Sequence, residues 1–133
     1  MKIIILGAGQ VGRTAATHLA REEANEVTVV DTNDDLLRDL QDRLDIRTVV
    51  GNGAHPSILE AAGAKSVDVF IALTNSDEVN MAACQIVSAL FNKDATRIAR
   101  IRTTDYVKQE KLFTGDDRAF AVDVTISPEQ IVT

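Results

Sequence analysis

Residues 3–12 read IIILGAGQVG, an apolar run that leads without a spacer into the pattern G-x-G-x-x-G. Four aliphatic residues in a row predict a short buried strand, and the apolar spacing after the glycines predicts a helix. Gly7 suits a tight turn, Gly9 lets a pyrophosphate approach the main chain, and Gly12 allows helix and strand to pack closely. The N–H groups and the positive end of the helix dipole then face the phosphates. We therefore predict a strand-turn-helix unit that binds phosphate.

An acidic residue, Asp31, ends the next apolar segment at residues 26–31 (EVTVVD). It follows the glycines by roughly 20 residues, the spacing at which a carboxylate reaches the hydroxyls of a ribose. The alternative is one more acid at a helix start, beside Asp34 and Asp35. No Arg or Lys lies between Asp31 and Arg38 to receive a 2′-phosphate, and the carboxylate would repel one. The pattern favours NAD(H) or ADP/ATP over NADP(H).

The bulk composition is that of one acidic globular domain. The chain has 133 residues and a formal net charge of −6, so it lacks the basic face that non-specific nucleic-acid binding needs. No apolar run reaches the roughly 18 residues of a membrane span, and we expect any membrane association to come through a partner. Cys84 is the single cysteine, and no Cys/His cluster has zinc spacing, which together favour a reducing cytoplasm.

Strand patterns alternate with helix patterns along the whole chain. We predict strands at residues 3–6, 26–31, 46–50, 68–73, 97–101 and 120–124. We predict helices after residue 10, from an N-cap at Thr32, from Pro56 to Gly63, from Glu78 to Phe91 with an N-cap at Asn75, and from Thr104 to Leu112. This alternation is typical of a Rossmann-like, doubly wound α/β fold with a parallel six-stranded sheet in the order 3-2-1-4-5-6.

The end of the chain predicts a boundary. Residues 127–130 read SPEQ, which combines a cap, a proline at the first helical position and an acid in the first turn. We therefore expect one nucleotide-binding domain over residues 1–126, and over 127–133 the start of a helix that leads to a further C-terminal part.

Three more segments follow predicted strand ends, where open α/β sheets bind ligands. Asn52 and Gly53 follow the third strand, where an amide can read a base edge and glycine leaves room for the base; a plain turn is the alternative. Residues 73–75 (LTN) end the strand beside the first one, and helix capping is their other role. Arg100 ends a buried strand, so its guanidinium needs an anionic partner, either a ligand phosphate or a carboxylate of another subunit.

The other polar residues have simpler structural interpretations. Asp77 and Glu78 could hold a divalent ion between phosphates, but acids favoured by the helix dipole are the simpler interpretation. Neither His18 nor His55 has Ser, Cys or Asp arranged around it as in a triad. Cys84 is most simply a small buried apolar group. We predict no catalytic residue and no metal site.

Motifs along essentially the whole chain resemble one family. They are MKIIILGAGQVG, VTVVDTN, GNGAHPSIL, ALTNSDEVNM, RIARIR and ISPEQ. They are similar to the N-terminal nucleotide-binding domain of the TrkA family of Trk potassium-uptake regulators, within the wider RCK/KTN group. The resemblance implies a regulatory subunit, not an enzyme, that binds NAD+/NADH and in some members ADP or ATP. It also implies a homo-oligomer, a dimer or ring, that transmits ligand state to a membrane potassium channel or transporter.

The resemblance, together with the strand ends, predicts a cofactor site at Gly7, Ala8, Gly9, Gln10, Val11, Gly12, Asp31, Thr32, Asn52, Gly53, Leu73, Thr74, Asn75 and Arg100. Some relatives have arginine where this chain has Gln10, a departure that favours NAD(H) over ATP. The expected location is cytoplasmic, at the inner face of the cell membrane through the transporter subunit. Two other functions stay open: the cofactor half of an NAD-dependent dehydrogenase, and an assembly module with an empty crevice.

Overall fold

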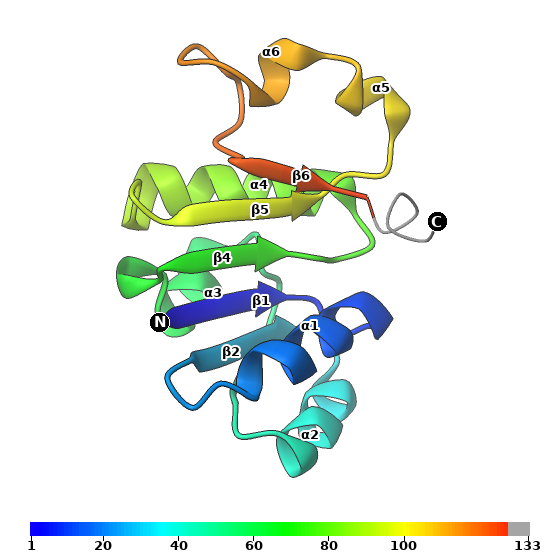
Figure 1. Ribbon diagram of the computed structural model, residues 1–133, viewed down its shortest axis with the longest axis vertical. Helices are drawn as coiled ribbons and strands as arrows, with labels where there is room; N and C mark the ends of the chain where they lie inside the picture. Colours follow the sequence, from blue (N-terminus) through cyan, green and yellow to red (C-terminus); the bar gives the residue numbers. More distant parts are fainter. Residues whose placement is uncertain (128–133) are drawn as a thin grey trace.

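The computed structural model describes residues 1–127 as one parallel β-sheet with helices on both faces (Figure 1). The strands are β1 Lys2–Leu6, β2 Glu26–Asp31, β3 Arg47–Val50, β4 Val69–Ala72, β5 Thr96–Arg100 and β6 Val124–Ile126. The helices are α1 Gln10–Ala20, α2 Asp34–Arg43, α3 Pro56–Ala61, the 3-10 helix η1 Ala64–Ser66, α4 Asp77–Ile86, the π-helix η2 Val87–Phe91, α5 Thr104–Val107 and α6 Glu110–Phe113. The strand order, β3-β2-β1-β4-β5-β6, confirms the predicted fold class. The predicted helix over 127–133 lies, apart from Ser127, outside the described residues.

β1 lies inside the sheet, and its alternate residues face opposite layers of helices. Ile3 and Ile5 belong to the core beneath α1 and α2, whereas Ile4 and Leu6 belong to the core beneath α3 and α4. All four side chains are at most 2% exposed. A parallel strand covered on both faces must be apolar at every position, which explains the unbroken aliphatic run. The order in which strands join the sheet reverses beside β1, because β2 and β3 lie on one side of it and β4 to β6 on the other. The carboxyl ends of β1 and β4 therefore border one crevice.

Two helix caps lie one residue later than predicted. Asn33, not Thr32, caps α2, because its Oδ1 accepts hydrogen bonds from the backbone N–H groups of Asp35 (3.0 Å) and Leu36 (3.2 Å). Ser76, not Asn75, caps α4 through a bond from the backbone N–H of Val79 to Ser76 Oγ, 3.1 Å long. Both corrections leave the preceding residue, Thr32 or Asn75, to the wall of the crevice.

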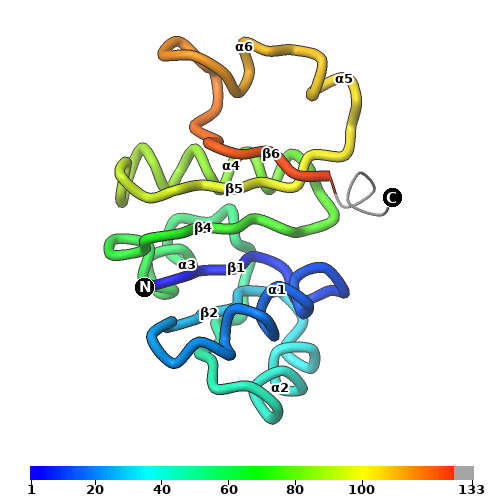
Figure 2. Tube along the Cα trace, in the orientation of Figure 1, coloured from blue at the N-terminus to red at the C-terminus, as the bar shows by residue number. Residues whose placement is uncertain are grey.

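The last third of the chain departs furthest from the prediction. The helix expected over 104–112 is two short helices, α5 and α6, in an excursion beside the sheet edge that Figure 2 follows from β5 back to β6. The strand expected over 120–124 begins only at Val124. The reason is Arg97, whose buried guanidinium donates a hydrogen bond to the carbonyl oxygen of Ala121 (2.7 Å) and forms an ion pair with Asp123 (3.4 Å). The helix expected to reach Phe91 is α-helical only to Ile86 and continues as η2.

Candidate functional site

The turn after β1 needs glycine at two positions for steric reasons. Gly7 has φ +104°, a conformation that residues with a Cβ rarely adopt, and a Cβ there would lie 2.9 Å from the carbonyl oxygen of Leu73. A Cβ on Gly12 would overlap the carbonyl oxygen of Gly7, so α1 packs directly on the turn. A Cβ on Gly9 would meet no described atom within 4 Å. Gly9 is therefore the glycine that presents bare backbone to open space.

A crevice of about 430 Å³ opens at this turn. Backbone hydrogen bonds from Gly7 N–H to the Val30 carbonyl and from Leu73 N–H to the Leu6 carbonyl, both 2.8 Å long, hold the ends of β1, β2 and β4 together around it. Its walls come from the glycine turn, the strand ends and the starts of α2 and α4: Leu6, Gly7, Gly9, Val30, Asp31, Thr32, Asn33, Leu36, Gly51, Asn52, Gly53, Leu73, Thr74, Asn75, Ser76 and Val79. The crevice is the ligand position expected for a doubly wound sheet.

Most of the predicted site residues meet in this crevice. Those on its walls are Gly7, Gly9, Asp31, Thr32, Asn52, Gly53, Leu73, Thr74 and Asn75. Within the described chain, five others lie outside its lining. Ala8 is fully buried, Gly12 packs against the turn, and Gln10 and Val11 line a separate apolar groove with Ile71 and Ile98. Arg100, only 8% exposed, lies behind the wall and donates to Asn75 Oδ1 at 3.3 Å.

The Asp31 carboxylate is fixed by the backbone on both sides. Its Oδ2 accepts the Ala8 N–H of the glycine turn, and its Oδ1 accepts the Asn33 N–H at the start of α2, both at 2.7 Å. An ionised carboxylate has about four acceptor positions, so two remain for hydroxyl donors. The carboxylate is thus held in one orientation at the crevice wall and keeps capacity for a ligand with a pair of hydroxyls.

The turn after β3 gives Asn52 and Gly53 different roles. Asn52 Oδ1 accepts the Ala54 N–H at 2.8 Å, so this oxygen forms the turn and the amide nitrogen is the group that can donate to a ligand. A Cβ on Gly53 would overlap the Leu6 side chain. Glycine at this position allows close packing on β1, and because Gly53 also lines the crevice, the role predicted for it, leaving room for a base, stays a prediction.

The wall beyond β4 depends on a residue that the sequence analysis missed. Asn80, inside α4, is fully buried and donates from Nδ2 to the carbonyl oxygens of Thr74 (3.1 Å) and Arg100 (2.8 Å). Its Oδ1 accepts from the backbone N–H (3.0 Å) and the hydroxyl (2.7 Å) of Thr74. The available signal was an asparagine on the apolar side of a helix, where a polar group must find partners.

The sequence profile of the TrkA-N domain matches residues 3–128. The chain belongs to the TrkA-N domain family. It is 58% identical over its whole length to the Trk system potassium uptake protein TrkA of Halomonas elongata and spans 28% of the length of that relative.

Two solved structures share the TrkA-N fold. The GsuK channel bound to NAD is 23% identical, with a TM-score of 0.67 over 79% of this chain and 18% of that one. GsuK bound to ADP is 20% identical, with a TM-score of 0.76 over 98% of this chain and 32% of that one. At these identities the likeness concerns the fold alone.

A second, larger hollow of this TrkA-N domain, about 680 Å³, lies beyond the ends of β5 and β6 and shares Asn75 with the crevice. Asp77 closes one side: its carboxylate accepts the N–H groups of Arg102 (3.0 Å) and Thr103 (2.8 Å). Burial alone would raise the pKa of Asp77, but hydrogen bonds from Thr103 and Arg102 outweigh it and hold the pKa below its ordinary value. Asp77 therefore has a structural role, tying α4 to the segment after β5.

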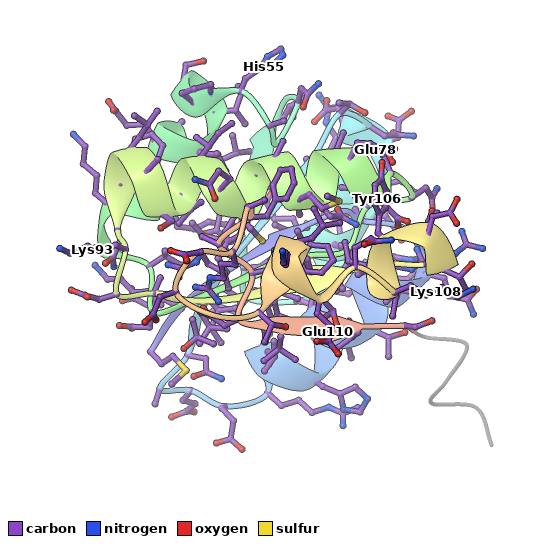
Figure 3. All side chains as sticks on the ribbon, turned by 90° about the horizontal axis from the view of Figure 1, so that it is seen from above. His55, Glu78, Lys93, Tyr106, Lys108 and Glu110 are labelled. Carbon is purple, nitrogen blue, oxygen red and sulfur yellow. The ribbon has the colours of Figure 1, made fainter. Side chains whose placement is uncertain are left out.

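Glu78 joins α4 to α5. Its Oε2 accepts the hydroxyl of Tyr106 at 2.7 Å, and Figure 3 shows the two side chains meeting from the two helices. This hydrogen bond raises the pKa of the Tyr106 phenol. Among residues 1–127 no group of three or more His, Cys, Asp or Glu is placed to hold a metal ion.

Cys84 has a simple structural explanation. Cys84 is fully buried, and burial raises its pKa to about 12, so the thiol stays protonated and acts as a small apolar group of the core, as predicted. His18 lies in α1 and His55 immediately before α3. In the part of the chain that the structure describes, no helix is both long enough and apolar enough to cross a membrane.

Proposed function

We propose that this TrkA-N domain is the nucleotide sensor of a potassium uptake system, with NAD(H) as its first ligand and ADP or ATP as competitors for the same crevice. The observation that carries the proposal is that Gly9 and Asp31 line the same crevice. Gly9 presents bare backbone at the start of α1, and Asp31 holds an oriented carboxylate with acceptor positions to spare. The first suits a diphosphate and the second suits a ribose.

The charge of the crevice favours a ligand without a 2′-phosphate. A phosphate on that hydroxyl would approach the Asp31 carboxylate, and like charges at such a distance repel each other. The nearest basic residue in sequence on α2, Arg38, is engaged with Asp34 at 2.9 Å. We therefore expect NADH to bind more tightly than NADPH.

Proteins similar to this chain indicate the biological setting of such a site. The Halomonas elongata relative is a Trk system potassium uptake protein, and structures of GsuK hold NAD in one case and ADP in another. We infer that the domain acts as a homo-oligomer on the cytoplasmic side of a membrane potassium transporter. If nucleotides bind two arrangements of the oligomer unequally, their ratio shifts the gating equilibrium. Each difference of about 1.4 kcal/mol in affinity shifts it tenfold, and equal binding shifts nothing.

Calorimetric titration of the purified protein with NADH, NADPH, ADP and ATP tests the proposal. We expect saturable NADH binding that Asp31→Ala weakens roughly 10- to 100-fold, because hydrogen bonds to a charged group are lost. Asp35→Ala is the matched control, since Asp35 is an exposed acid of the same helix start and lies outside the crevice lining. Equal NADH affinity of the wild type and Asp31→Ala would reject the placement of the ribose.

The absorbance of NADH with added substrates, and the heat and Tm changes with nucleotides, separate the two other functions. A regulatory site leaves NADH unoxidised when small-molecule substrates are added, whereas the cofactor half of a dehydrogenase would consume it with one of them. An assembly module with an empty crevice would show neither heat of binding nor a change in Tm with any of the four nucleotides.

A further inference from the structure

Asn80 uses the full hydrogen-bonding capacity of its side chain on one task. An asparagine amide has two donor and two acceptor positions, and all four are occupied at distances of 2.7 to 3.1 Å. Three of the bonds go to Thr74 and the fourth to the carbonyl of Arg100. A single buried side chain therefore fixes the backbone after β4 to the end of β5.

The bonds of Asn80 begin where the sheet ladder stops. The last paired residues of β4 and β5 are Ala72 and Ala99. Beyond this pair, Asn80 joins Thr74 to Arg100, and the Arg100 guanidinium in turn donates to Asn75 Oδ1 at 3.3 Å. The four residues form a closed ring of contacts, and two of them, Thr74 and Asn75, are crevice wall.

The part of a ligand that would meet this wall follows from the position of the glycine turn. Gly7 lies against the backbone of Leu73 and Thr74, since a Cβ on it would be 3.2 Å from Thr74 N. Asp31 and Asn52 lie on the other side of the turn, at the ends of β2 and β3. A nucleotide with its ribose at Asp31 and its first phosphate at Gly9 must pass Thr74 and Asn75 if it extends further.

We propose that Asn80 is the positioning residue for the distal half of the ligand, the second phosphate and whatever group follows it. This inference rests on the proposed function of the crevice and adds a specificity to it: Asn80 sets how much more tightly the domain binds a dinucleotide than a mononucleotide. Asparagine suits the task because it offers donors to two carbonyls and an acceptor to two donors. Aspartate would instead place an oxygen against the carbonyls of Thr74 and Arg100, with no proton between them.

Calorimetry of NADH and AMP on the purified wild type and Asn80→Asp provides the test. We expect the variant to bind NADH about tenfold or more weakly and AMP within about twofold of wild type, because AMP ends before the displaced wall. The matched control is Asn92→Asp. Asn92 also donates to a backbone carbonyl, that of Val67 at 2.9 Å, but Val67, unlike Thr74, is not part of the crevice wall. We expect Asn92→Asp to lower Tm and to leave the ratio of the two affinities unchanged.

The outcomes are distinguishable. Equal losses of NADH and AMP affinity in Asn80→Asp would make Asn80 a structural residue only and overturn this inference, while leaving the proposed function standing. A wild type that binds neither ligand would overturn both. If Asn80→Asp does not fold, the side-chain amide signals of Asn80 in the wild-type NMR spectrum give the answer. They should shift on saturation with NADH and stay in place with AMP, and identical responses to both ligands would reject the inference.

Discussion

The two sides of the crevice are built by different means. On the side of β1 and β2, steric fit shapes the glycine turn: Gly7 takes a left-handed conformation, and Gly12 lets α1 touch the turn, to which Asp31 adds one hydrogen bond. On the side of β4 and β5, the wall is held by the buried polar side chains of Asn80 and Arg100. The first side should fail when atoms are added to it, and the second when hydrogen bonds are removed from it.

The largest effect is expected from one added methyl group. Gly12→Ala places a Cβ on the carbonyl oxygen of Gly7, and because both atoms belong to ordered backbone, we expect a loss of more than about 3 kcal/mol in the free energy of unfolding. Gly9→Ala is the control, since its Cβ meets open space; its stability should stay within about 1 kcal/mol of wild type while NADH binding weakens. Urea denaturation measures the free energy of unfolding of both variants. Equal stability of the two would contradict the claim that steric fit shapes the β1 side of the crevice.

Asp77 ties the β4 side of the crevice to the segment after β5. Asp77→Asn replaces an acceptor that faces two N–H groups, and at neutral pH we expect a loss of about 1 to 3 kcal/mol. The pKa of Asp77 is lower in the folded state than its ordinary value of 3.8, so its carboxylate stabilises the fold above that pH. The contribution disappears as the pH falls through the folded pKa. Urea titrations between pH 7 and 3 should show the difference between wild type and variant shrinking below about pH 4; a difference independent of pH would contradict the assignment.

Two helix caps border the crevice, one on each side. Asn33 caps α2 on the β2 side, and Ser76 caps α4 on the β4 side. Replacing either by alanine should cost about 1 kcal/mol, the usual value for a lost cap. Because caps act locally on both sides, thermal unfolding should give similar losses. A much larger loss for Ser76→Ala would mean that the cap also supports the Asn80 ring.

The smallest expected effect is a shift in the pKa of Tyr106 with the fold unchanged. The chain contains one tyrosine, so the ultraviolet absorbance of tyrosinate reports on Tyr106 alone. Its hydrogen bond to Glu78 raises the pKa above the ordinary value of 10.0, and Glu78→Gln should move it back toward that value. An unchanged midpoint would show that α4 and α5 do not make this contact in solution.

The same contrast explains what the sequence could predict. The β1 side of the crevice could be predicted because its parts lie close together in the sequence: a strand, a glycine turn and a carboxylate at a known spacing. The fold class and strand order follow from the alternation of such units and were confirmed. The β4 side depends on a residue six positions beyond Thr74 and on another in the next strand, Arg100. No local pattern marks which buried asparagine will reach which carbonyl.

The errors in the last third of the chain have the same physical origin. The strand expected from Phe120 was displaced because Arg97 claims the Ala121 carbonyl and the Gln85 side chain accepts the Ala121 N–H at 2.8 Å. The sequence does have a strand pattern here, but the Ala121 N–H and carbonyl are hydrogen-bonded to side chains and cannot pair with a neighbouring strand.

The two cap errors also depended on neighbouring side chains. Thr32 and Asn75 are acceptable cap residues, but the adjacent Asn33 and Ser76 form the caps.

We propose that the nucleotide binds in the crevice at the turn after β1 and not in the larger hollow beside Asp77. A crystal structure of the protein grown with NADH tests it directly. We predict the adenosine ribose hydroxyls within hydrogen-bonding distance of the Asp31 carboxylate and the diphosphate over the backbone of Gly9. NADH bound in the hollow lined by Asp77, Arg102 and Thr103, with the crevice empty, would contradict the claim.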